Sequence, residues 1–431
     1  MFKELKKNIL NKHFKEVAVF GSSTFVLKIV GLFLSYLVIL FVTKNYGADI
    51  YGKYSLSIAF SQIITLTFTL GLPILIVRII SDKVFYENQP KANFLKKINK
   101  IVFIVGLLLS GLVYVTSDYI SIYILKDQTY SWYLKTLSFF ILPLMFHEVF
   151  LGFFKGKKDF FKHNLFLFIL PPIFFFLFFI LLKEKISSEG FVFLCYLLSI
   201  ALVFLIELFF YLPEVYKSRE LNYKTKILLK DSFPMMYSGL LLYLLSWTDI
   251  FMIENLRTSK EVGIYTTAFK VASIGFLVIT SINVVIAPKI AELYSKKDIK
   301  QLHKTIVNTT RLISVFTLPL VAVMIFFRKE ILSFFGAEFI AGENALILIA
   351  LGILFSAMSG TVDQILNMTN QQKVLRNIIL FSFVLNVVLN YLLIPKFGIE
   401  GAAFASLITN VFLNSICIFY IRKKIGFYTF V

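Results

Sequence analysis

Charged residues are scarce in this chain, and residues that commonly perform catalysis are scarcer. Asp, Glu, Lys and Arg make up 16% of the 431 residues, against about 25% in soluble domains. There are only four His and two Cys. Cys195 and Cys417 fall inside apolar stretches, without the spacing of a metal site or a disulfide framework. His147-Glu148 continues with Val-Phe-Leu, so the zinc-protease pattern HExxH fails. The sequence therefore predicts no enzyme, no metal site and no cofactor.

Nucleotide-binding and nucleic-acid-binding motifs are missing as well. Residues 47–54 approach the P-loop pattern, but Tyr54 stands where that pattern needs a Ser or Thr hydroxyl for Mg²⁺. The formal net charge of +19 would indicate nucleic acid in a soluble protein. Here the basic residues lie in short links between apolar stretches, and no RNA-binding or zinc-finger pattern accompanies them. The sequence predicts neither an ATP site nor a nucleic-acid partner.

Hydrophobic residues are abundant, at 58% of the chain with 50 Phe and 21 Tyr, and the mean hydropathy is +0.81. A helix that crosses about 30 Å of hydrocarbon needs about 20 apolar residues. Twelve stretches qualify within a few residues: 17–43, 54–77, 98–117, 132–153, 163–182, 190–212, 232–253, 262–287, 310–327, 341–366, 374–394 and 401–421. We expect an all-α polytopic membrane protein of about 12 transmembrane helices in contact with membrane lipids, joined by short polar links such as 288–309.

The distribution of Lys and Arg predicts the orientation. If the N-terminus is placed in the cytoplasm, 31 of the 44 Lys and Arg residues fall in cytoplasmic segments, which is the side that these residues favour. Residues 1–16 are basic and polar, and no short apolar segment with a cleavage site follows them. We expect this segment to be a cytoplasmic lead-in to the first span and both termini to be cytoplasmic.

A short internal repeat divides the chain. Tyr51–Ser55 opens the second apolar stretch, and the similar Val262–Thr266 opens the eighth. Parallel repeats related by an axis along the membrane normal are a known transporter architecture. We therefore expect an N-terminal six-helix lobe at residues 1–212, a cytoplasmic linker at 213–231 and a C-terminal six-helix lobe at 232–431.

Two lysines, Lys28 and Lys270, lie inside predicted spans. A charge at the bilayer centre costs about 2.5–3.5 kcal/mol on insertion scales, and it is tolerated where it faces a bundle interior or a watery cavity. Both lysines are candidates for binding an anionic substrate. The alternatives are a structural ion pair or an apolar stem that lets the ammonium reach the interface. The second alternative is harder for Lys28, near the bilayer middle, than for Lys270, which lies closer to the outer interface. Lys53, at the outer start of span 2, is either interfacial or a third substrate ligand.

Three acidic residues in spans are candidates for gating or ion coupling. Asp249 on span 7 lies at a depth comparable with Lys270 on span 8, so the two could form a pair, either structural or gating. Glu148 and Glu207 lie near the cytoplasmic ends of spans 4 and 6. Each is a candidate for coupling to a proton or another cation, or an interfacial carboxylate that pairs with the basic links.

Two asparagines on span 11, Asn386 and Asn390, are four residues apart and therefore share one helix face. Polar side chains on such a face form hydrogen bonds between membrane helices, worth about 0.6–2 kcal/mol each, or line a polar cavity. Both interpretations remain open from the sequence.

Several segments, in order along essentially the whole chain, carry a family resemblance: Tyr46–Tyr54 at the span 1–2 turn, Gly152–Phe160 at the span 4–5 turn, Thr248–Ile253 with Glu261–Lys270 at spans 7–8, and Val387–Thr409 at spans 11–12. In these segments the chain resembles the Wzx-type flippases of bacteria, the O-antigen and capsule repeat-unit translocases of the multidrug/oligosaccharidyl-lipid/polysaccharide exporter superfamily.

The resemblance implies two six-helix lobes around a central cavity that opens alternately to either side. It implies an undecaprenyl-diphosphate-linked oligosaccharide as substrate, moved from the cytoplasmic to the periplasmic leaflet of a bacterial inner membrane for O-antigen or capsule-type polysaccharide. The cavities of the family tend to be cationic, so the resemblance implies that Lys28 and Lys270 bind the substrate there, with Lys53 as a weaker candidate. Asp249 matches the family's acid on span 7. A coupling proton or sodium ion and the polysaccharide polymerase machinery are the further expected partners.

Other readings stay open. A cation-coupled multidrug or small-molecule antiporter has the same fold, and fold alone does not determine the substrate. Its coupling would rely on buried carboxylates, whereas this chain places its lysines deeper than most of its acids. A polymerase or ligase would carry a large periplasmic loop, which the short links exclude. A lipid II flippase of the same superfamily resembles a longer design of fourteen spans, so the prediction of twelve spans argues against this alternative.

Overall fold

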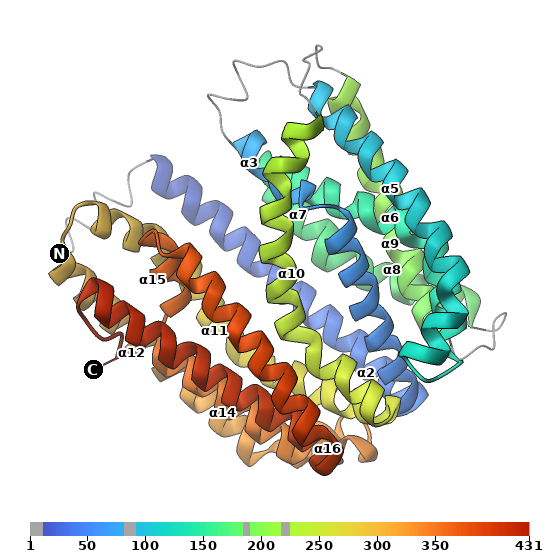
Figure 1. Cartoon of the computed structure of the whole chain (residues 1–431). Helices are drawn as coiled ribbons and strands as arrows, with labels where there is room; N and C mark the ends of the chain where they lie inside the picture. The colour runs from blue at the N-terminus through green and yellow to red at the C-terminus, as the bar shows by residue number, and fades with distance from the viewer. Residues whose placement is uncertain (1–11, 82–91, 184–189, 217–224, 431) are drawn as a thin grey trace. The chain divides into compact units, whose positions relative to one another are not determined.

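The computed structural model describes residues 12–81, 92–183, 190–216 and 225–430, and every regular element in these ranges is a helix (Figure 1). Ten of the described helices are long and apolar enough to cross a membrane. The prediction of an all-α polytopic membrane protein is therefore confirmed. The count of twelve spans and the side on which the termini lie stay predictions.

The chain folds as two compact units, Met1–Phe41 with Phe60–Leu240 and Val42–Ala59 with Leu241–Val431. Helices α2 (Lys12–Phe68) and α10 (Thr225–Leu256) contribute to both units. The first unit also holds α3 (Leu72–Ser81), α5 (Ala92–Tyr119), α6 (Tyr130–Gly156), α7 (Phe160–Asn164), α8 (Leu170–Leu182) and α9 (Phe191–Tyr216), with π-helical turns at Ile120–Ile124 and Leu165–Ile169. The second holds α11 (Ser259–Ser295), α12 (Ile299–Phe326), α13 (Arg328–Ser333), α14 (Glu343–Ser359), α15 (Val362–Met368) and α16 (Gln372–Ile425), with a 3₁₀ turn at Ala337–Gly342. The predicted lobe boundaries stay predictions.

Helices α2 and α16 are each broken at a glycine. α16 has 54 residues, which is about 80 Å at 1.5 Å per residue and far longer than one bilayer crossing. Gly398 interrupts it with φ 55°, and Gly47 interrupts α2 with φ 74°, backbone conformations that only glycine adopts readily. The side chain of Glu338 accepts a hydrogen bond from the backbone N–H of Ala48 at 2.7 Å, beside the first break. The breaks lie where the sequence places the links between spans 1 and 2 and between spans 11 and 12.

Two predicted spans are not continuous helices. The stretch 54–77 is interrupted by a turn at residues 69–71, and the stretch 341–366 is interrupted at Gly360. Apolar length alone cannot distinguish one long helix from two shorter ones, because the residues of the turn are themselves mostly apolar or neutral.

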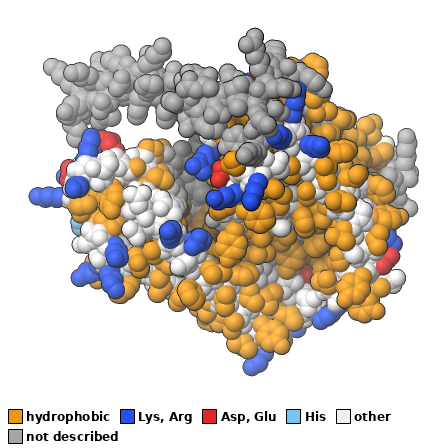
Figure 2. Space-filling view, turned by 45° about the horizontal axis from the view of Figure 1, so that its top comes forward, with side chains coloured by type: hydrophobic (Ala, Val, Ile, Leu, Met, Phe, Trp, Pro, Cys, Tyr) orange, Lys and Arg blue, Asp and Glu red, His pale blue; other side chains and the backbone are white. Residues whose placement is uncertain are grey.

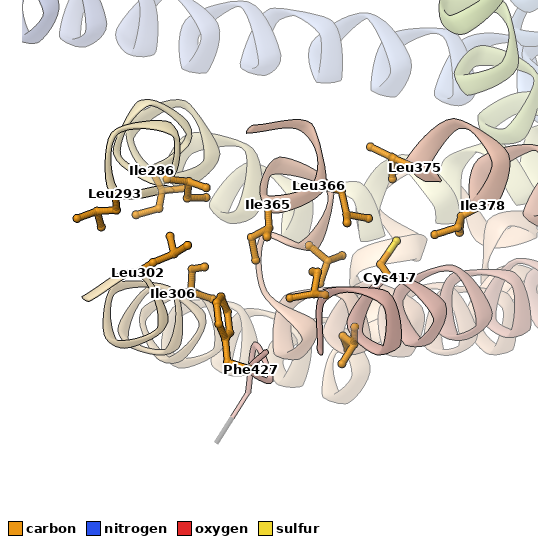
Figure 3. Packing of buried hydrophobic residues seen from close by; sticks show 14 residues of the cluster. Ile286, Leu293, Leu302, Ile306, Ile365, Leu366, Leu375, Ile378, Cys417 and Phe427 are labelled. Carbon is orange, nitrogen blue, oxygen red and sulfur yellow. The ribbon is translucent and has the colours of Figure 1, made fainter. Parts of the chain in front are cut away.

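The link predicted at 288–309 is mostly helical. α11 continues to Ser295 and α12 begins at Ile299, beyond the apolar part that a bilayer would cover. Both extensions are amphipathic, and they bury hydrophobic side chains against α15, the two ends of α16 and the C-terminal Phe427 (Figure 3). The ring of His303 stacks on Phe427 with ring centroids 4.9 Å apart. Helical structure therefore continues past the span because one face of each extension joins a hydrophobic core.

The two copies of the internal repeat pack against each other within the second unit. Gly52 of α2 and Gly263 of α11 lie at this crossing, and a Cβ added to Gly52 would lie 1.8 Å from the carbonyl oxygen of Ser259. Small residues of this kind allow membrane helices to approach closely. The close approach explains why residues 42–59 belong to the second unit.

Gly263→Ala is expected to destabilise the protein, because the added Cβ would lie 2.0 Å from the carbonyl oxygen of Ala48. Overpacking of this kind costs about 1–3 kcal/mol, occasionally more, and should lower the melting temperature of the purified protein in detergent. Gly111→Ala is the control, since nothing lies within 4 Å of a Cβ at that position. It should be neutral or slightly stabilising because Ala favours helix more than Gly. Equal melting temperatures for the two variants would contradict the close crossing.

The outer surface is strongly hydrophobic. Hydrophobic side chains cover much of the face shown in Figure 2. Leu108, Val115 and Phe209, on α5 and α9, are 68%, 78% and 76% exposed. In water such surfaces would mark an interface, whereas on spans of this length they are the ordinary surface that contacts lipid.

Candidate functional site

Asp249 is a buried carboxylate on α10, with 3% of its surface exposed. Four side chains donate hydrogen bonds to it: Tyr265 of α11 and Asn386, Asn390 and Ser406 of α16. Nδ2 of Asn386 and of Asn390 lie 3.3 and 2.6 Å from Oδ1, and Oγ of Ser406 lies 2.5 Å from Oδ2. We call these five residues the Asp249 cluster. It joins three helices of the second unit at one carboxylate.

The two asparagines lie on one face of α16 and are 1% and 0% exposed. Nδ2 of Asn390 also lies 3.0 Å from Oδ1 of Asn386. The Oδ1 atom of Asn390 is buried and accepts no hydrogen bond from a described residue, and an unpaired buried acceptor costs about 1–3 kcal/mol. Carboxylate, amide and hydroxyl oxygens are the ligands that hard cations prefer. The cluster thus has the chemistry to hold a proton or a small cation.

Lys270 lies on α11, with Nζ 5.7 Å from the ring centroid of Trp247. Trp247 precedes Asp249 by two residues, and its ring stacks on Tyr243 with centroids 5.6 Å apart. A cation over an aromatic ring is stabilised by about 0.5–2 kcal/mol. The described hydrogen bonds to Asp249 come from neutral side chains, so the Lys270–Asp249 pair stays a prediction.

Lys53 is buried at 7% exposure, and its Nζ lies 3.3 Å from Oδ2 of Asp49, whose side chain is 53% exposed. Both residues belong to the part of α2 that is packed into the second unit. Burial distinguishes Lys53 from an ordinary interfacial lysine, but its role in binding substrate stays a prediction.

Lys28 is exposed on α2 and belongs to the first unit. It interacts electrostatically with His163 at the start of the fifth predicted span. An exposed cation on a membrane helix requires water or phosphate groups around its ammonium. Lys28 and Lys270 come from different compact units.

Glu207 is fully buried on α9, and its Oε2 lies 2.9 Å from Nδ1 of His147 on α6. Glu148, the next residue on α6, is half-buried. The partner of Glu207 among the described residues is a buried histidine of a neighbouring helix, and the roles expected of Glu207 and Glu148 stay predictions.

The structure therefore brings together three of the predicted residues, Asp249, Asn386 and Asn390. Sequence reasoning misses Tyr265, Ser406 and His147. Tyr265 carries a signal, since it belongs to the internal repeat, but a lone Ser in an apolar span carries none. His147 is set apart only by its position next to Glu148.

Among the described residues, no group of three or more His, Cys, Asp and Glu could hold a metal ion. The Asp249 cluster contains a single carboxylate, so its remaining oxygens are neutral. Such a set suits a proton or a monovalent cation better than a tightly bound transition metal.

The sequence matches two protein-family models and several known proteins. A family model described as "Polysaccharide biosynthesis protein" matches residues 20–294, well over half of the chain, and the MatE model matches residues 234–392. The probable low-salt glycan biosynthesis flippase Agl15 of Haloferax volcanii is 30% identical over 165 residues, 38% of this chain and 35% of that protein. The capsular polysaccharide biosynthesis protein CapF of Staphylococcus aureus is 31% identical over 197 residues, 44% of this chain and 48% of that protein. The matched segments thus span half or less of these relatives.

A solved structure of the lipid II flippase MurJ in an inward closed conformation has the same fold, with a TM-score of 0.75 at 16% identity. The similarity covers 95% of this chain and 90% of that one. At this identity the likeness shows the fold alone. The family match over residues 20–294 shows that the chain belongs to the polysaccharide biosynthesis protein family.

Proposed function

We propose that the protein is a flippase that moves polyprenyl-diphosphate-linked oligosaccharide repeat units from the cytoplasmic to the outer leaflet of a bacterial inner membrane. The family match over residues 20–294 carries the proposal. The names of Agl15 and CapF, a glycan flippase and a capsular polysaccharide protein, support the substrate class. The product would enter O-antigen or capsule-type polysaccharide through a polymerase on the far side.

The mechanism that we propose is alternating access between two lobes. A diphosphate cannot cross about 30 Å of hydrocarbon unaided, and fixed cations offset the loss of its hydration. Lys28 and Lys270, supported by Lys53, would bind the diphosphate while the polyprenyl tail stays in the lipid. No step uses ATP, so a cation gradient or consumption of the product would drive the cycle.

The Asp249 cluster is the proposed site for the coupling cation. Its single carboxylate, its two buried amides and the Oδ1 of Asn390, which accepts no hydrogen bond from a described residue, support this role. A proton or a sodium ion at Asp249 would neutralise the charge of a carboxylate to which four neutral side chains donate hydrogen bonds.

Translocation of a defined probe tests the function. Proteoliposomes that contain the purified chain and a fluorescent polyprenyl-diphosphate-N-acetylglucosamine are treated with dithionite, which bleaches only the outer leaflet. The chain should make nearly all of the probe accessible, whereas protein-free liposomes protect the inner half. A fluorescent phosphatidylcholine is the control lipid and should stay protected.

A cation-coupled multidrug antiporter is the second candidate, favoured by the MatE match to residues 234–392. It predicts that ethidium accumulates in the same proteoliposomes under a sodium or proton gradient. Ethidium transport without translocation of the lipid-linked sugar would overturn the flippase proposal.

A further inference from the structure

A buried histidine–glutamate pair lies in the first unit, apart from the Asp249 cluster. Nδ1 of His147 lies 2.9 Å from Oε2 of Glu207, and the two side chains are 7% and 0% exposed. The other carboxylate oxygen, Oε1 of Glu207, is buried and has no hydrogen-bond partner among the described residues. A buried carboxylate is usually satisfied at both oxygens, because an unpaired charge at low dielectric costs several kcal/mol.

Aromatic rings flank the pair along both helices. Phe204 and Tyr211 lie three residues before and four residues after Glu207, on the same side of α9. Phe150 of α6 stacks on Phe204 with centroids 5.8 Å apart and contacts Tyr211 at 4.3 Å. Such surroundings exclude water and strengthen the interaction between the imidazole and the carboxylate.

Other titratable groups face the pair. Glu148 on α6 interacts electrostatically with both His147 and Glu207, and His163 on α7 interacts with His147. Tyr196 on α9 interacts with Glu148. The proton occupancy of the pair therefore depends on a second carboxyl next to it, as in coupled titrating sites.

The pair suits a proton rather than a metal cation. A sodium or calcium ion requires several oxygen ligands, whereas His147 already occupies one oxygen of Glu207 and only Oε1 remains open. With one proton shared between them, the imidazole and the carboxylate are neutral together. Without it, a single negative charge stays buried with Oε1 unpaired, a state that is stable only if water reaches the site.

We propose that His147 and Glu207 form a proton-binding site in the first unit that takes up and releases one proton in each transport cycle. The inference rests on the proposed transport function, because it assigns a second coupling site to that cycle. Glu207 lies nine residues before the end of α9 at Tyr216, about 14 Å along the helix at 1.5 Å per residue. A proton could therefore reach it through local opening of the helix ends.

Histidine NMR tests the site without transport. The full chain contains four His, so ¹⁵N-histidine labelling in nanodiscs gives few signals, and His147→Gln identifies the relevant one. The His147 signal should change between its neutral and cationic forms between about pH 5 and 8. Its midpoint should shift by about 1–3 pH units in Glu207→Gln, as for a group that loses an opposite charge within contact distance. A His147 signal that stays in one form across this range overturns the proposal.

Coupling is tested with the fluorescent lipid-linked sugar in proteoliposomes under a gradient of one pH unit. Each proton carried per cycle contributes about tenfold per pH unit to the steady-state leaflet ratio. The wild type should respond at least tenfold, and Glu207→Gln should still translocate the probe with a response about tenfold smaller than that of the wild type. Glu214→Gln is the control, because Glu214 lies on the same helix, is partly exposed and pairs with Lys157 at 2.5 Å.

The outcomes separate the two proposals. If Glu207→Gln keeps the full wild-type response to the pH gradient, the proton site is wrong while the flippase function stands. If the wild type moves no probe, the flippase function fails, and the histidine titration alone decides whether the pair binds a proton. The deciding observation is the titration of the His147 signal in the wild-type chain, and His147→Gln serves only to assign that signal, so poor folding of Glu207→Gln does not remove the test.

Discussion

Asp249→Asn is expected to abolish cation-driven transport while leaving the protein folded. The substitution keeps the shape of the side chain but removes the only charge of the Asp249 cluster, which four donors now stabilise. The carboxylate is the one negative charge of the cluster that attracts a cation, so its loss should weaken cation binding by tenfold or more, about 1.4 kcal/mol per factor of ten. The measurement is the dependence of lipid-linked sugar translocation on an imposed sodium or proton gradient.

Asp249→Ala should additionally destabilise the second unit. It leaves the hydroxyls of Tyr265 and Ser406 and the amides of Asn386 and Asn390 without their acceptor in a buried site. Each unpaired donor costs about 1–3 kcal/mol, so a clear fall in melting temperature is expected. Asp118→Asn is the control, because Asp118 is an exposed carboxylate that pairs with Lys135 at 2.9 Å. Gradient-driven transport by Asp249→Asn at the wild-type rate would rule out the cluster as the coupling site.

Lys28→Ala and Lys270→Ala are each expected to block assembly of the surface glycan in cells while the protein level stays normal. The proposed contact of an ammonium with a diphosphate is charge-assisted, and losing about 1.5–3 kcal/mol lowers affinity by about 10–100-fold. Arg keeps the charge, so Lys28→Arg and Lys270→Arg should partly restore function. Glycan staining of whole cells and immunoblotting of the membrane fraction provide the two readouts.

Lys260→Ala is the matched control for this series. Lys260 lies on the same helix as Lys270, is 56% exposed and pairs with Glu338 at 3.2 Å, so its removal should leave the glycan unchanged. Normal glycan in both alanine variants of the intramembrane lysines would show that the proposed cationic cavity is wrong. A defect in Lys28→Ala alone would confine substrate binding to the first unit.

The structure changes how the predicted acidic residues are understood. Asp249, Glu148 and Glu207 appear equivalent in the sequence, since each is a single acid in an apolar stretch. In the fold, Asp249 is bonded by four neutral donors, Glu207 by one histidine, and Glu148 is half-buried beside that histidine. Their candidate roles therefore separate into a cation site and a proton site.

Membrane class, the approximate positions of the helices and the presence of charges within them follow from the sequence by itself. They depend on local apolar length and on composition, which are properties of consecutive residues. The common face of Asn386 and Asn390 also follows, because it needs only the helical period.

The tertiary structure alone decided which groups meet. Asp249 and Ser406 are 157 residues apart, and His147 and Glu207 are 60 residues apart. The depth of a residue along its helix does not specify which neighbouring helix it faces. The continuation of α11 and α12 past the apolar region was likewise decided by packing, through the core around Phe427. At the break of the predicted span 54–77, Gly71 has φ 71° and lies so close to α10 that an added Cβ would be 2.4 Å from the carbonyl oxygen of Ser232.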